Sequence, residues 1–138
     1  MFQLTVQAEF AAAHALTIAG RREPVHGHNW HVTAELEGPT LDADGLLCDF
    51  HTVESTLRDL IEPFRNADLN AIPPFDTVNP SAERVAEYIA SELRARLDGA
   101  LAPHARVSAV RVTEAPGCAA TYRPAVVSWA RGDEDGSA

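Results

Sequence analysis

The 138-residue chain can build one hydrophobic core and is too short for two. Its net charge of −9, with only 11 lysines and arginines, argues against a nucleic-acid partner, because binding a phosphate backbone needs many basic side chains. No stretch approaches the roughly 18 apolar residues of a membrane span, and the amino terminus lacks the pattern of a secretory signal. We therefore expect one cytoplasmic domain over residues 1–130, without membrane contact, followed by a disordered polar tail over residues 131–138.

Two stretches alternate apolar and polar residues with a period of two, as half-buried strands do. The first covers residues 2–14 and carries its apolar residues at even positions. The second runs from His26 to Glu37 and again places its apolar residues, among them Trp30 and Val32, at even positions. Further on, residues 106–114 alternate in the same way, and residues 118–130 can form a last strand.

Two helices are predicted between these pairs of strands. The first has an amphipathic stripe made of Val53, Leu57, Leu60, Ile61 and Phe64. For the second, Asn79 is expected to cap the helix with Pro80 at its first position, and apolar residues recur every fourth position until Gly99 ends it. The order of two strands, two helices and two strands indicates an α+β fold with a four-stranded antiparallel sheet and both helices on one face. Since such a sheet leaves two edges unpaired, we expect an oligomer.

Three of the six histidines converge if the first two strands pair as antiparallel neighbours. His14 lies near the end of one strand, His26 and His28 lie near the start of the other, and all three have the parity of the apolar face. Three neutral imidazoles with an open fourth position are typical of a catalytic zinc ion. Alternatively, these are core histidines satisfied by hydrogen bonds. His31 has the opposite parity and is not expected to bind metal.

Glu114 shares a strand face with Val110 and Val112. A carboxylate on an apolar face is costly to bury unless it is paired or hydrogen-bonded. A ligand with adjacent N–H donors would satisfy it, and so would a structural ion pair with an arginine.

Five segments, "FAAAHAL", "HGHNW", "GLLCDF", "NPSAERVAEYIA" and "VRVTEAPGCAATYRP", together resemble the family of 6-pyruvoyl-tetrahydropterin synthase and 6-carboxytetrahydropterin synthase. The resemblance covers residues 2 to about 124 in the right order. It implies the tunnelling fold, in which subunits join their sheets into a barrel, usually a homohexamer of two stacked trimers. It also implies a Zn²⁺ ion held by His14, His26 and His28, a pterin gripped by Glu114, and a hydroxyl from Ser81 near the pterin ring.

The sequence departs from the family pattern where catalytic groups are expected. The position of the nucleophilic cysteine holds Arg22, and the positions of an Asp-His pair hold Arg65 and Asn66. Two carboxylates are candidates to replace the missing groups. Glu23 gives "E-x-x-H-G-H", which resembles a family branch in which glutamate replaces the cysteine, and Asp68 lies in the loop that normally carries the Asp-His pair. Both could equally be solvated surface residues.

These features favour a zinc-dependent lyase that acts on 7,8-dihydroneopterin triphosphate or a related pterin, with Glu23 and Asp68 as catalytic candidates. Two alternatives remain at this stage. The chain could bind a pterin-like ligand without turning it over, or it could be a diverged enzyme that acts on a different heterocycle.

Overall fold

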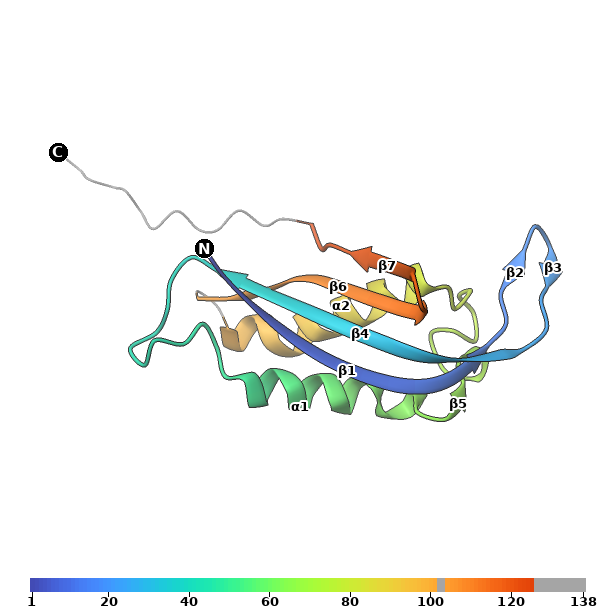
Figure 1. Cartoon of the computed structure of the whole chain (residues 1–138), viewed down its shortest axis with the longest axis horizontal. Helices are drawn as coiled ribbons and strands as arrows, with labels where there is room; N and C mark the ends of the chain where they lie inside the picture. The colour runs from blue at the N-terminus through green and yellow to red at the C-terminus, as the bar shows by residue number, and fades with distance from the viewer. Residues whose placement is uncertain (102–103, 126–138) are drawn as a thin grey trace.

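The computed structural model describes residues 1–101 and 104–125, and its chain forms an α+β fold of one sheet and two helices (Figure 1). The sheet has the strand order β5 (Ala67–Asp68), β1 (Phe2–His14), β4 (His26–Gly38), β6 (Arg106–Ala115) and β7 (Cys118–Tyr122). Every neighbouring pair is antiparallel except β1 and β5, which are parallel.

The prediction of four strands was therefore wrong by one. The additional strand, β5, is two residues long and pairs beside Ala12 and Ala13 of β1. Two residues are too short to produce a periodic pattern in the sequence. The pairing begins at Asn66, whose backbone N–H donates to the carbonyl of Ala11 at 2.6 Å. The predicted last strand, 118–130, ends at Tyr122 within the described residues. Residues 126–130 and the predicted polar tail, 131–138, lie outside the described residues.

The long pairing of β1 with β4 fixes which side chains face the core. It runs without a shift from Phe2 opposite Gly38 to His14 opposite His26. The even-numbered side chains face the helices, and most of them are buried, including Phe10, Trp30 and Val32, which pack in one cluster with the buried residues of both helices. The helices α1 (Phe50–Ile61) and α2 (Ala82–Leu101) thus cover one face of the sheet and leave the odd-numbered face open (Figure 1). Among the described residues, no helix is long and apolar enough to cross a membrane.

The helix ends differ from prediction in two places. The first helix begins after Asp49, whose side chain accepts from the N–H of His51, and it continues into the 3₁₀ turn η1 (Glu62–Phe64). The second begins at Ala82, because the Ser81 hydroxyl caps it by accepting from the N–H of Arg84 at 3.2 Å. Asn79 is therefore not the cap, and the helix continues through Gly99 to Leu101.

A short hairpin, separate from the main sheet, lies beyond the histidines in the connection between β1 and β4. It consists of β2 (Thr17–Ile18) and β3 (Arg21–Arg22), joined by Ala19 and Gly20, which both have positive φ. Figure 1 shows this hairpin projecting past the end of the main sheet. We call residues 15–25, which include it, the arm. A further 3₁₀ turn, η2 (Leu69–Ala71), follows β5.

Candidate metal centre and ligand cavity

The three predicted histidines meet where β1 ends and β4 begins. The register places His14 opposite His26 and Ala12 opposite His28, so that the three imidazoles share the helix-covered face. One ring nitrogen from each lies within 4.8 Å of the other two. Two nitrogens bound to a tetrahedral zinc ion through bonds of about 2.0–2.1 Å lie about 3.4 Å apart, so movements of the rings of about 1 Å would bring the three nitrogens to bonding distance. The shared face predicted from strand parity is confirmed, and so is the antiparallel pairing on which the convergence of the histidines depended, so the cluster can hold a metal ion.

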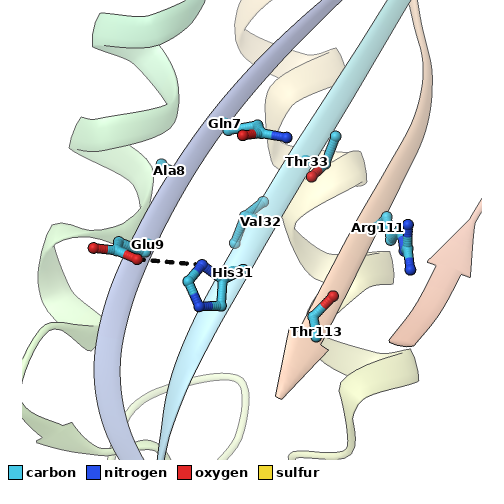
Figure 2. A pocket seen from close by; sticks show the side chains of 8 residues that line it. All are labelled: Gln7, Ala8, Glu9, His31, Val32, Thr33, Arg111 and Thr113. Carbon is cyan, nitrogen blue, oxygen red and sulfur yellow. Dashed lines mark ion pairs between the residues drawn. The ribbon is translucent and has the colours of Figure 1, made fainter. Parts of the chain in front are cut away.

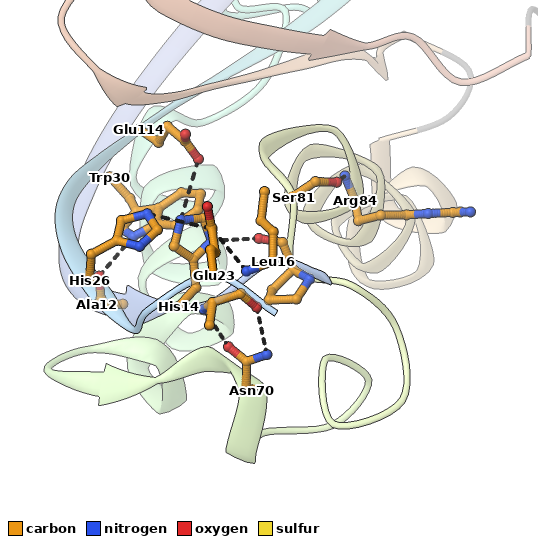
Figure 3. A network of polar contacts seen from close by, with 12 residues as sticks. Ala12, His14, Leu16, Glu23, His26, Trp30, Asn70, Ser81, Arg84 and Glu114 are labelled. Carbon is orange, nitrogen blue, oxygen red and sulfur yellow. Dashed lines mark hydrogen bonds and ion pairs between the residues drawn. The ribbon is translucent and has the colours of Figure 1, made fainter. Parts of the chain in front are cut away.

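Backbone carbonyls orient two of these rings. The Nδ1–H of His14 donates to the carbonyl of Pro80 at 2.7 Å, and the Nδ1–H of His26 donates to the carbonyl of Pro24 at 2.9 Å. Because a carbonyl only accepts, both rings carry their proton on Nδ1, which leaves the lone pair of Nε2 free. Such a bond behind a ligating imidazole is the usual way that proteins fix a metal-binding histidine. Figure 3 shows His14, His26 and their polar neighbours.

The three histidines suit a metal ion because two of their ring nitrogens lack a hydrogen-bond partner. Nε2 of His14 and Nε2 of His28 are buried without a hydrogen-bond partner. An unpaired buried polar atom costs about 1–3 kcal/mol, so folded proteins rarely keep two of them together without a reason. A cation shared by these atoms would satisfy both. In addition, burial lowers the pKa of His28 below its usual value, which favours the neutral imidazole that binds metals.

Two carboxylates approach the histidines. Oε2 of Glu114 lies 3.8 Å from Nε2 of His14, and Oε1 of Glu23 lies 3.8 Å from Nε2 of His26. Both side chains are partly exposed, at 26% and 32%. Each carboxylate therefore faces both the histidine cluster and solvent, where a bound ligand would lie.

Glu114 and Ser81 line one cavity. It lies between the start of α2 and the turn from β6 to β7, and its volume is about 330 Å³. This is within the range of about 300–1,000 Å³ that is typical of small-molecule sites. The structure thus brings together the two residues that the family resemblance assigns to substrate binding, although they are 33 positions apart in the sequence.

Glu23 lies in the arm and is tied to Leu16 by two bonds. Its Oε1 accepts from the N–H of Leu16 at 2.9 Å, and its own N–H donates to the carbonyl of Leu16, also at 2.9 Å. The carboxylate is therefore held beside His26, within reach of a group bound at the cluster.

Asp68 and His31 lie elsewhere. The Asp68 side chain caps η2 by accepting from the N–H of Asn70, and the same residue lines a hollow that also contains His28. His31 lies on the open face of the sheet, where its Nδ1 is 3.2 Å from Oε2 of Glu9 (Figure 2). The hollow shown there, about 500 Å³, is lined by none of the predicted site residues. Within the described residues, His31 is not part of the histidine cluster that can hold a metal ion, and its exposed position on the opposite face agrees with the parity predicted for it.

Fold and site together define an α+β protein with a three-histidine cluster that can hold a metal ion, beside a cavity lined by a carboxylate. Residues 3–125 match the family model described as 6-pyruvoyl tetrahydropterin synthase. The chain therefore belongs to the 6-pyruvoyl tetrahydropterin synthase family.

Solved structures of the family share the fold. The chain is similar to the 6-pyruvoyl tetrahydropterin synthase of Caenorhabditis elegans, with 19% identity and a TM-score of 0.77 over 89% of this chain and 95% of that one. It is also similar to the enzyme of Plasmodium vivax, with 22% identity and a TM-score of 0.74 over 89% and 97%. Another Plasmodium vivax structure, of a mutant in which a glutamate described as catalytic is replaced by alanine, matches with 20% identity and a TM-score of 0.73 over the same shares. No curated protein matches the sequence.

Several site residues escape sequence reasoning. Pro80 supplies a carbonyl, and any residue would offer the same group, so no side-chain pattern marks it. Asn70 and Asn79 bind the backbone of the arm through their side-chain amides, as described below. The Asn-Pro pair at 79–80 does signal a turn, but the turn binds the arm instead of capping the helix.

Proposed function

We propose that the protein is a zinc-dependent pterin lyase, acting on 7,8-dihydroneopterin triphosphate or a close relative. The observation that carries the proposal is the pair of buried, unpartnered Nε2 atoms of His14 and His28, next to the cavity lined by Glu114 and Ser81. The family membership adds support.

In this proposal, the chain binds the substrate at two points. The carboxylate of Glu114 accepts hydrogen bonds from the amino and ring N–H groups of the pterin, and the hydroxyl of Ser81 lies beside the ring. Zinc held by His14, His26 and His28 would polarise the oxygens of the substrate side chain. Because Glu114 and the histidines are adjacent, ring and side chain can be bound at the same time.

Glu23 is the proposed proton carrier. Its carboxylate takes the proton from a side-chain hydroxyl, the adjacent carbon–carbon bond breaks, and the electron pair passes into the conjugated ring. The same carboxyl group then returns the proton to the side-chain carbon that remains on the ring. The products are an aldehyde and 6-hydroxymethyl-dihydropterin. The Plasmodium vivax enzyme, in which the residue described as catalytic is a glutamate, supports a carboxylate in this role.

Asp68 is the second catalytic candidate. It lines a hollow together with His28, from which it could assist proton transfer. Its present bond to the N–H of Asn70 also gives it a structural task. Asp68→Asn separates the two roles, since an amide oxygen can keep the cap but cannot carry the proton.

We further propose a homohexamer built as two stacked trimers. Two features support assembly. The outer edge of β1 is paired with β5 only at Ala12 and Ala13, and β7 is the other edge of the five-stranded sheet. In addition, the odd-numbered face of the sheet is open and polar (Figure 2). Sheet edges with free backbone groups are suited to pairing with other copies.

A pterin-binding protein without turnover is the second candidate. The observation that favours it is the use of the family's Asp-His positions for structure. Arg65 forms an ion pair with Glu62 at 3.2 Å, and Asn66 has a φ of 56° and bonds to Ala11 through its backbone. Neither a guanidinium group nor a side-chain amide can act as the acid–base group of the reaction.

Glu23→Gln distinguishes the two candidates. The amide oxygen can still accept from the N–H of Leu16, so the arm should keep its geometry while the acid–base group is lost. For a lyase we expect unchanged pterin affinity and a loss of turnover of about 10²- to 10⁴-fold. Glu54→Gln is the matched control, because Glu54 pairs with Arg58 on α1 and touches neither the cavity nor the histidines. Turnover that is equal in Glu23→Gln and wild type would remove Glu23 from the mechanism, and tight binding with no turnover in wild type would favour the binding protein.

A further inference from the structure

The segment that leaves the metal centre toward the arm has unusual backbone partners. The pairing of β1 with β4 ends at His14, so Ala15 and Leu16 have no partner in the main sheet. Ala15 is only 1% exposed, and its backbone N–H and carbonyl therefore need partners within the protein.

Two side-chain amides supply the missing backbone partners, one for Ala15 and one for Thr17. The N–H of Ala15 donates to Oδ1 of Asn70 at 2.8 Å, and Nδ2 of Asn70 donates to the carbonyl of Ala15 at 2.9 Å. Two residues on, the N–H of Thr17 donates to Oδ1 of Asn79 at 2.9 Å, and Nδ2 of Asn79 donates to the carbonyl of Thr17 at 3.1 Å. An amide presents an acceptor and a donor side by side, as a neighbouring strand would.

The intervening residue faces the other way. In an extended chain, successive residues direct their N–H and carbonyl groups to opposite sides. Leu16 accordingly bonds in both directions to Glu23, on the side away from the two asparagines. The two amides and the carboxylate therefore hold the same three residues from both sides.

These contacts connect to the metal centre at two points. Ala15 directly follows His14, whose ring is buried in the histidine cluster. Asn79 directly precedes Pro80, whose carbonyl accepts from Nδ1 of His14. In the loop before α2, Asn79 thus binds the arm, and the next residue, Pro80, orients the ring of His14.

We infer that Asn70 and Asn79 are positioning residues: together they fix the segment 15–17, and through it both the ring of His14 and the carboxylate of Glu23. This inference rests on the proposed function for the role of Glu23. The placement of His14 does not depend on any reaction and can be measured without substrate.

The test uses isosteric variants of the full chain in its zinc-free form. Asn79→Asp keeps the side-chain volume and the oxygen that accepts from the N–H of Thr17, but it replaces the amide nitrogen that donates to the carbonyl of Thr17 by a second oxygen. Asn70→Asp makes the same change opposite Ala15. Hydrogen-exchange mass spectrometry of the arm should show exchange about tenfold or more faster in each, because the hydrogen bond of about 1 kcal/mol from the amide nitrogen to the carbonyl is lost and two oxygens repel each other in its place. Thr77→Ala is the matched control, since Thr77 lies in the same loop as Asn79 and bonds only to the carbonyl of Pro74. If Asn70→Asp does not fold, the exposed Asn79 carries the test alone.

A second readout addresses the metal centre. Cobalt bound to the wild type reports ligand geometry through its visible absorption, and we expect both asparagine variants to shift this spectrum and to bind cobalt about tenfold more weakly. The control should match the wild type. Unchanged arm exchange would overturn the inference, and so would faster exchange with an unaltered cobalt spectrum and affinity. Because neither readout involves pterin, an inactive wild-type protein with a released arm in the variants would reject the proposed reaction and keep the positioning role.

Discussion

Replacing His14 with asparagine should abolish metal binding while leaving the fold almost as stable. In the wild type, the carbonyl of Pro80 accepts a hydrogen bond from Nδ1 of His14 at 2.7 Å. The amide nitrogen of an asparagine can occupy the place of Nδ1 and donate to the same carbonyl. What the substitution removes is Nε2, the buried atom without a hydrogen-bond partner.

The expected change in the stability of the metal-free protein is small because two effects oppose each other. The smaller side chain leaves a cavity that costs on the order of 1 kcal/mol. Removal of the unsatisfied Nε2 returns about 1–3 kcal/mol, of which burial of the new amide oxygen takes back a part. We therefore expect the free energy of unfolding in the presence of a chelator to stay within about 2 kcal/mol of the wild-type value.

Zinc should separate the two proteins clearly. A ligand at 100 times its dissociation constant stabilises the native state by about 2.7 kcal/mol, which for a domain of this size raises Tm by roughly 5–11 °C. Differential scanning calorimetry with and without zinc should show this rise for the wild type and none for His14→Asn. His31→Asn, on the open face of the sheet, should behave as the wild type does. An equal zinc response in His14→Asn and the wild type would refute the assignment of the metal centre.

Three other predictions concern the cavity, the pH response and the packing. Glu114→Gln should weaken binding of a dihydropterin, measured by fluorescence titration, by about 10- to 100-fold, because hydrogen bonds to a charged acceptor contribute about 1.5–3 kcal/mol; an unchanged affinity would exclude Glu114 from the site. Burial lowers the pKa of His28 from 6.5, so below about pH 6.5 the unfolded chain binds a proton at His28 that the metal-free folded chain does not bind. The Tm measured in chelator should therefore fall as the pH drops below about 6.5, and it should fall less steeply in His28→Asn. A parallel decline in both proteins would contradict that origin. Gly38→Ala should destabilise strongly, because its Cβ would lie 1.6 Å from the carbonyl oxygen of His104, whereas Gly99→Ala, with open space around it inside α2, should raise stability by about 0.4–1 kcal/mol; comparable denaturant midpoints for the two variants would contradict the packing.

The strands that build the metal centre follow from the sequence because their pattern is long and regular. Thirteen residues of β1 and thirteen of β4 alternate with one parity, and parity alone assigns His14, His26 and His28 to one face and His31 to the other. Antiparallel pairing of sequential strands then brings the three histidines together.

Short elements and helix ends were beyond the same reasoning. β5 has only two residues, and it forms because the chain that leaves η1 runs alongside β1. No local sequence pattern indicates this contact. The arm hairpin is equally short, and its partners Asn70 and Asn79 lie more than 50 residues away in the sequence. Asparagine is a residue type that favours the cap position, but the side-chain amide of Asn79 binds Thr17, and Ser81 caps the helix instead. In each case a tertiary contact decides what local propensity leaves open.

The most direct test of the proposed function is anaerobic incubation of zinc-loaded protein with 7,8-dihydroneopterin triphosphate, in the presence of an aldehyde-trapping reagent, with products identified by mass spectrometry. We expect 6-hydroxymethyl-dihydropterin together with a trapped aldehyde in equal amount, and neither product from Glu23→Gln. Recovery of the substrate unchanged from protein that binds it, with zinc at the three histidines, would contradict the lyase assignment.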